Sequence, residues 1–188
     1  MSHVALFHSV YGLRPAVLAA ADRLRAAGHE VVAPDLYGEP AAGTVDDGFA
    51  LLDRIGRDTV LARARAAVAD LPPGAVLAGF SFGCAVAAEL LAERPDAAGL
   101  LLLHGIAGGP QAVRPGLPVQ LHLADPDEYE PQEEVDAWQR AMTAAGADLT
   151  VFRYPGPGHL YTDPDIPDYD AAAAELTWER VLAFLDGR

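Results

Sequence analysis

The pentapeptide GFSFG at residues 79–83 places a single serine, Ser81, between two glycines. It follows the apolar run Ala75–Phe80, which is typical of a buried strand, and it precedes a segment from Cys84 with helical spacing. A strand-to-helix turn this tight needs small flanking residues, and it lifts the serine hydroxyl above the sheet at the positive end of a helix. The pattern predicts a nucleophilic serine, and a glycine-rich turn that is merely capped by serine is the alternative.

A serine hydroxyl is a weak nucleophile unless a base takes its proton, and the chain has six histidines. His159 is the candidate base because it ends the glycine- and proline-rich segment Tyr154–His159, which can hold an imidazole over the sheet. A histidine within a strand is more often a core residue than a base. The three histidines predicted in or at the ends of strands are His8, His104 and His122, and the two predicted at the surface are His3 and His29.

Two aspartates that could orient the histidine follow the predicted strand Val119–Leu123. We prefer Asp127, because several residues beyond the strand are needed to reach the back of the imidazole. Asp125 precedes a proline, which is a common role for aspartate in turns. The order Ser81, Asp127, His159 is the order in which α/β-hydrolases carry their catalytic residues.

Acyl transfer also needs N–H donors for the oxyanion that forms on the reacting carbonyl. The backbone N–H of Phe82, directly after the serine, is one candidate. The backbone N–H of Val10, in the loop after the first predicted strand, is the other, since Gly12 lets this loop fold close to the nucleophile. Four aromatic residues could line a substrate pocket or equally belong to the core: Tyr11, Tyr37, Phe82 and Tyr161.

Short apolar runs alternate with longer segments of helical spacing along the whole chain. The predicted strands are Val4–His8, Glu30–Ala33, Ala75–Phe80, Gly99–Leu103, Val119–Leu123 and Leu149–Tyr154. The predicted helices are Pro15–Ala27, Phe49–Asp70, Cys84–Arg94, Pro131–Ala145 and Tyr169–Phe184. This alternation predicts the α/β class, with a mostly parallel sheet of about six strands and helices on both faces. We expect one domain over residues 1–188, with its functional groups at the carboxyl ends of the strands.

Composition narrows the classes of partner and cofactor. The 188 residues carry a formal charge of −14, which disfavours binding to nucleic acid or anionic membranes. The lone cysteine, Cys84, can form neither an intramolecular disulfide nor a cysteine-based zinc site. No phosphate-binding loop, dinucleotide fingerprint or metal-ligand cluster is present, so we expect no cofactor and no metal. With no signal-peptide pattern, we expect a cytoplasmic protein that acts on a small molecule as a monomer or homodimer.

Four short motifs in one order resemble the dienelactone hydrolase family over nearly the whole chain. They are the segment 33–37 (APDLY), the pentapeptide 79–83, the segment 122–131 that contains Asp127, and the segment 154–159 that ends in His159. The resemblance implies a compact α/β-hydrolase fold without a separate lid domain. It also places Asp127, rather than Asp125, where the family has its acid.

The chain departs from the family pattern in three respects. Ser81 stands where founding members carry a nucleophilic cysteine, and Ser9 stands where they carry a glutamate that contacts the nucleophile. Cys84 is too far into the predicted helix to replace the lost cysteine. The two arginines that hold a substrate carboxylate in the family correspond to about Val45 and to Asp163. Because a desolvated carboxylate needs paired donors, these changes favour a neutral or cationic ester over an anionic one.

The expected function is therefore that of a serine hydrolase that cleaves a small carboxylic ester, lactone or thioester through an acyl-enzyme on Ser81. Two alternatives remain at this point. One is a non-catalytic relative that binds a small molecule in the same cleft, since a fold does not fix a function. The other is an acyltransferase, which would use the same three residues and pass the acyl group to an alcohol or amine.

Overall fold

The computed structural model describes all 188 residues and contains one six-stranded sheet. The strands are β1 (His3–Phe7), β2 (Glu30–Val32), β3 (Val76–Phe80), β4 (Gly99–Leu103), β5 (Pro118–Asp125) and β6 (Asp148–Pro155). The helices are α1 (Pro15–Ala26), α2 (Val45–Ile55), α3 (Arg57–Val68), α4 (Phe82–Glu93), α5 (Gln132–Ala144) and α6 (Ala171–Asp186), with a short 3-10 turn, η1 (Pro110–Ala112). The predicted six-stranded α/β architecture is confirmed.

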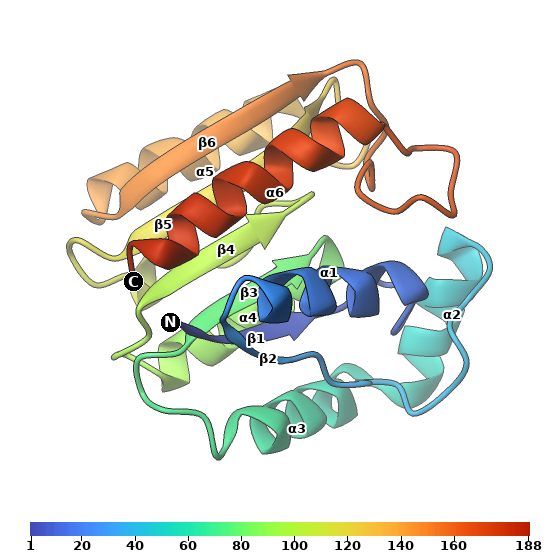
Figure 1. Cartoon of the computed structure of the whole chain (residues 1–188), viewed down its shortest axis with the longest axis horizontal. Helices are drawn as coiled ribbons and strands as arrows, with labels where there is room; N and C mark the ends of the chain where they lie inside the picture. Colours follow the sequence, from blue (N-terminus) through green and yellow to red (C-terminus); the bar gives the residue numbers. More distant parts are fainter.

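All strand pairs are parallel, and their order across the sheet is β2-β1-β3-β4-β5-β6. The chain runs outward from β1 to β2 and then returns to β3 on the other side of β1. Such a reversal leaves a crevice between the carboxyl ends of β1 and β3, where open α/β sheets bind their ligands. Figure 1 shows α1 and α6 in front of the sheet, with α4 and α5 behind it.

Alternation of side chains along the strands divides the core into two layers. In β3, Leu77 packs with α3, α4 and α5 in a cluster of 25 buried residues. Its neighbours Val76 and Ala78 face the opposite side and pack with α1 and α6 in a cluster of 16. Because both faces of the sheet are covered, the central strands β1, β3 and β4 are apolar at nearly every position, and this explains why continuous runs identified them.

Two details of the prediction are wrong. The expected helix Phe49–Asp70 is two helices, because Gly56 between α2 and α3 adopts φ +84°, a conformation that no helix accepts. His29, expected at the surface, is 5% exposed, and its Nδ1 accepts a hydrogen bond from the Ser2 N–H at 3.3 Å. The residues around Gly56 fit a continuous helix, so they do not indicate the break. The residues around His29 do not indicate that its side chain is buried.

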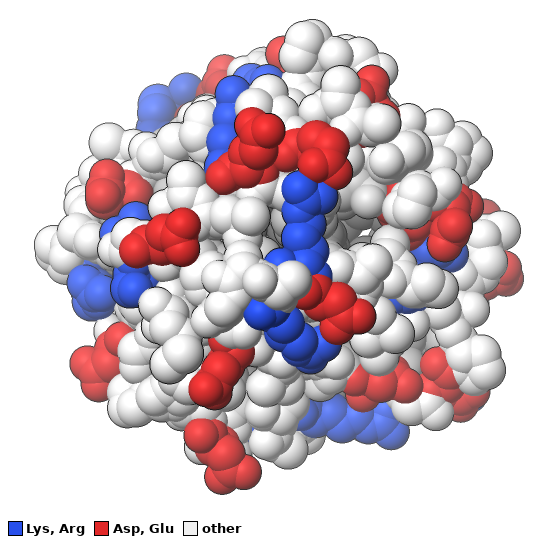
Figure 2. Space-filling model, in the orientation of Figure 1, with Lys and Arg blue, Asp and Glu red and all other residues white.

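The surface mixes both signs of charge despite the acidic balance. On the face shown in Figure 2, arginine side chains lie among acidic ones, and several contact them directly. An exposed ion pair joins Arg23 of α1 to Glu175 of α6, at 2.6 Å. None of the helices has the length and apolarity needed to cross a bilayer.

Candidate active site

Ser81 occupies the turn between β3 and α4 in a strained backbone conformation. Its φ is +50° and its ψ is −111°, which an L-residue adopts only when the surrounding structure enforces it. The two glycines make this turn possible. A Cβ on Gly79 would lie 2.1 Å from the carbonyl carbon of Gly83, and a Cβ on Gly83 would lie 2.3 Å from the carbonyl oxygen of Phe7. The tight turn therefore presents the half-buried serine at the carboxyl edge of the sheet.

The structure brings Ser81, His159 and Asp127 into one hydrogen-bonded chain. The His159 Nδ1 lies 2.8 and 2.9 Å from the two carboxylate oxygens of Asp127, and its Nε2 lies 2.8 Å from the Ser81 Oγ. A carboxylate can only accept, so Nδ1 carries the proton and Nε2 is left to accept from the serine hydroxyl. This is the tautomer in which an imidazole can take a proton from Ser81.

Asp127, and not Asp125, contacts the histidine. The Asp127 side chain is 1% exposed and also accepts the Tyr129 N–H at 3.0 Å, which fixes its carboxylate. Asp125 is the exposed last residue of β5, and its carbonyl oxygen accepts the Gly156 N–H at 3.1 Å. Asp125 thus helps to hold the loop that carries His159 without touching the imidazole.

Several hydrogen bonds hold the loop after β6 in place around His159. The Asp168 side chain accepts the Leu160 N–H at 2.9 Å, and the Asp168 carbonyl accepts the Gly158 N–H at 3.2 Å. Thr162 forms a 2.7 Å hydrogen bond with Nε2 of His104, at the end of β4. These contacts limit the freedom of the imidazole to leave Ser81.

The strand histidines are buried core residues, as predicted. His8 donates from Nδ1 to the Ser9 carbonyl at 2.8 Å and accepts the Leu36 N–H on Nε2 at 3.1 Å. His122 contacts the Tyr154 hydroxyl and the Gln120 side chain. Burial lowers the pKa of His122 to about 3 and also lowers the pKa values of His8 and His104. All three therefore stay neutral near pH 7, and none forms a hydrogen bond with the Ser81 side chain.

The two proposed oxyanion donors, the N–H groups of Phe82 and Val10, are both free. Neither donates to a carbonyl or to a side chain of the protein. Phe82 is the first residue of α4, where a helix leaves its N–H groups without partners. The β1–α1 loop with Val10 lies against the same end of α4, since Gly83 closely approaches the carbonyls of Phe7 and His8.

Of the four aromatic residues left open by the sequence, two are core and two border the site. Tyr37 and Tyr161 are 1% and 0% exposed. Tyr11 belongs to a small apolar cluster with Val10 and Leu160, and the half-buried Phe82 packs against it. Cys84 points away from this surface, because its Sγ lies 3.1 Å from the Gly79 carbonyl and burial raises the pKa of its thiol.

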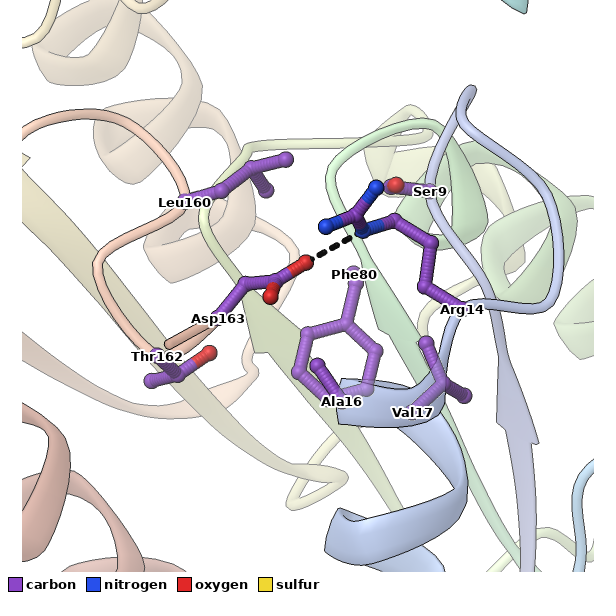
Figure 3. Close-up of a pocket in the computed structure, with 8 residues that line it drawn as sticks. All are labelled: Ser9, Arg14, Ala16, Val17, Phe80, Leu160, Thr162 and Asp163. Carbon is purple, nitrogen blue, oxygen red and sulfur yellow. Dashed lines mark hydrogen bonds and ion pairs between the residues drawn. The ribbon is translucent and has the colours of Figure 1, made fainter. Parts of the chain in front are cut away.

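Arg14, which the sequence gave no reason to select, neutralises Asp163. Its Nε donates to the Asp163 Oδ2 at 2.6 Å, and the two side chains are 13% and 9% exposed. Figure 3 shows them reaching toward each other across a small cavity that Ser9, Phe80 and Leu160 help to line. The cavity measures about 20 Å³, room for one water molecule but not for an ester. Asp163 is therefore not an unpaired acid facing a substrate.

Breaking this pair is expected to destabilise the protein, because either partner alone would be a buried charge. Arg14→Met and Asp163→Asn should each lower the free energy of unfolding by about 3 kcal/mol, and the double variant should lose clearly less than their sum. Urea unfolding measures all three. The control is Glu175→Gln, which breaks the exposed pair with Arg23 and should change stability little. Strictly additive losses would show that the pair has no coupling energy.

Comparison with known proteins places the chain in a family. The model of the dienelactone hydrolase family matches residues 2–187. A carboxymethylenebutenolidase from Rhodococcus opacus is 26% identical over an alignment of 205 positions, which covers 97% of this chain and 80% of the relative. A putative carboxymethylenebutenolidase from Escherichia coli K12 is 40% identical over 52 residues, which cover 28% of this chain and only 19% of the relative's length.

Solved structures share the fold at low sequence identity. A putative dienelactone hydrolase from Klebsiella pneumoniae superposes with a TM-score of 0.81 at 18% identity, covering 100% of this chain and 88% of the other. A dienelactone hydrolase-like promiscuous phosphotriesterase from metagenomic libraries has a TM-score of 0.79 at 20% identity, with coverage of 100% and 86%. The family match over residues 2–187, together with this shared fold, shows that the chain belongs to the dienelactone hydrolase family.

Proposed function

We propose that this protein is a serine hydrolase that cleaves small carboxylic esters, lactones or thioesters through an acyl-enzyme on Ser81. One observation carries the proposal: the Ser81 hydroxyl, the His159 imidazole and the Asp127 carboxylate form a single chain of hydrogen bonds of 2.8–2.9 Å. Membership of the dienelactone hydrolase family supports the same class of reaction. The relatives named carboxymethylenebutenolidase make a lactone one candidate substrate.

In the first half of the reaction, Ser81 Oγ attacks the substrate carbonyl carbon while His159 Nε2 takes the hydroxyl proton. The carbonyl oxygen becomes an oxyanion and accepts hydrogen bonds from the N–H groups of Phe82 and Val10, at about 3 kcal/mol of transition-state stabilisation per donor. Asp127 stabilises the imidazolium without taking its proton. The carbon–oxygen or carbon–sulfur bond to the leaving group then breaks, and His159 returns the proton to that group.

In the second half, His159 removes a proton from water, and the resulting hydroxide equivalent attacks the acyl carbon. Collapse of the second tetrahedral intermediate breaks the bond to Ser81 Oγ, which recovers its proton from His159. The carboxylic acid product then leaves. The same acyl-enzyme would serve an acyltransferase, and products formed with added alcohols distinguish the two activities.

The geometry favours this reaction over a binding-only role. His159 points at Ser81, its loop is fastened by Asp168 and Thr162, and both N–H donors are free. A protein that only binds a small molecule has no chemical need for a serine in a strained turn within hydrogen-bond distance of an imidazole.

Labelling with a fluorophosphonate probe tests the proposal. The probe phosphonylates serines that a neighbouring base activates, so the wild-type protein should be labelled and Ser81→Ala should not. Prior heat denaturation of the wild type should abolish labelling, because it separates Ser81 from His159. Equal labelling of the wild type and Ser81→Ala, or no labelling of either, would contradict an activated Ser81.

A further inference from the structure

Glu130 holds a carboxyl group beside the nucleophile. Its Oε1 accepts the Ile106 N–H at 3.2 Å, in the loop after β4. Gly105 lies between this carboxyl and the serine turn. The point at which a side chain of Gly105 would begin is 2.8 Å from the Glu130 Oε1 and 3.4 Å from the Ser81 Cα. Because Gly105 has no side chain, only a small gap separates the Glu130 carboxyl from the Ser81 backbone.

No cation of the protein neutralises this carboxyl. The charged groups with the largest effect on it are His159, from the loop after β6, and the acids Asp127 and Glu134, from its own segment. On the α4 side it faces the buried, neutral Cys84. Glu130 takes part in no ion pair, whereas the comparable acid Asp163 is bound to Arg14. An unpaired acid is thus present at the site, and it is Glu130 rather than Asp163.

Burial raises the pKa of Glu130 to about 7, and the Ile106 N–H and His159 only partly oppose this effect. The group is therefore ionised on the alkaline side of neutrality. A half-buried carboxylate attracts a nearby cation more strongly than a carboxylate in bulk water does. For the same reason it repels a nearby anion more strongly.

We propose that Glu130 is a specificity-determining residue that favours substrates with a cationic group a few bonds from the reacting carbonyl and disfavours anionic ones. This inference rests on the proposed hydrolysis at Ser81. It extends that proposal by assigning the charge preference to one side chain that takes no part in the hydrogen-bonded chain. The neighbouring Tyr129 supports such a site, because its half-exposed ring lies 4.8 Å from the His159 ring and offers an aromatic surface next to the carboxylate.

Matched pairs of substrates test the proposal. The first pair is the 4-nitrophenyl esters of 5,5-dimethylhexanoic acid and of 4-(trimethylammonio)butanoic acid, and the ester of 4-sulfobutanoic acid is the anionic counterpart of this pair. The second pair places the charge on the leaving group: butyrylthiocholine and 3,3-dimethylbutyl thiobutanoate. The measured quantity is the ratio of kcat/KM for the charged ester to that for its neutral partner, so any general loss of activity cancels.

In the wild type near pH 8, the cationic ester should be favoured over its neutral partner and the sulfonate disfavoured. Glu130→Gln should lower the cation-to-neutral ratio about tenfold in at least one pair. The control is Glu133→Gln, which removes the same charge from an exposed position in the first turn of α5 and should leave both ratios unchanged. Ratios that are the same in wild type and Glu130→Gln, in both pairs, would overturn the proposal.

The wild type supplies a second test that needs no variant. Because the trimethylammonium group does not titrate, the cation-to-neutral ratio should rise as pH increases through about 7, where Glu130 ionises. Any other pH dependence of the reaction affects both esters and cancels in the ratio. A ratio that does not change between about pH 6 and pH 8 would count against Glu130. Failure of the proposed function itself looks different: Ser81→Ala would then hydrolyse the neutral esters at the wild-type rate.

Discussion

Ser81→Ala should lower kcat/KM for 4-nitrophenyl pentanoate by at least about 10⁴-fold, because it removes the atom on which the acyl-enzyme forms. The remaining activity would come from the free N–H groups of Phe82 and Val10, which still stabilise an oxyanion for direct attack by water. The variant should fold normally. Alanine fits wherever serine does, and the Ser81 side chain bonds only to His159. Initial rates measure the loss of activity, and circular dichroism of the same preparations shows whether the variant is folded.

Cys84→Ala is the control for this experiment. Cys84 is the other nucleophilic side chain close to the turn, and it stands in a family whose founding members use cysteine. Its Sγ is buried against the Gly79 and Leu103 carbonyls, and burial raises the pKa of its thiol, so it has neither access to substrate nor a thiolate. Cys84→Ala should stay within about threefold of the wild type. If Cys84→Ala lost its activity and Ser81→Ala retained it, Cys84 and not Ser81 would be the nucleophile.

The sheet could be predicted because its signals are local. Strands covered on both faces are apolar at almost every position, so Ala75–Phe80 and Gly99–Leu103 were recognisable without any knowledge of their neighbours. The break at Gly56 could not be predicted, because a glycine within a helical pattern is compatible with both a continuous and a divided helix. The burial of His29 depends on Ser2 and on the end of α6, far away along the chain.

In the candidate site, too, the residues marked by local patterns could be predicted, and those whose environment comes from distant segments could not. Ser81, Asp127 and His159 were selected from chain order and from the strand ends that carry them, and the structure brings the three together. Arg14 and Glu130 were missed because their environment is made by distant segments. Arg14 meets an aspartate 149 positions away, and Glu130 meets the backbone of a loop 24 positions away. A spacing rule cannot detect either contact, since no motif fixes those distances.

Asp127→Asn should lower kcat by about 10³- to 10⁴-fold with little change in KM, the effect that this substitution has in serine proteases. The Asp127 carboxylate accepts at both oxygens from His159 Nδ1. An asparagine amide can turn its NH2 group toward Nδ1, which would then have to accept, and the ring proton would move to Nε2. An Nε2 that carries a proton cannot take one from Ser81. Stopped-flow measurement of acylation should therefore show a loss as large as that in steady-state kcat.

Asp125→Asn is the matched control, because it makes the same chemical change two residues earlier. Asp125 bonds to the loop of His159 through its carbonyl oxygen, which the substitution retains, and its exposed side chain does not touch the imidazole. Its kcat should stay within about threefold of the wild type. The contrast between the two variants separates a carboxylate that holds the tautomer from a general loss of negative charge, since both variants lose one charge. Equal losses in Asp125→Asn and Asp127→Asn would mean that charge, and not the contact with Nδ1, is what the histidine requires.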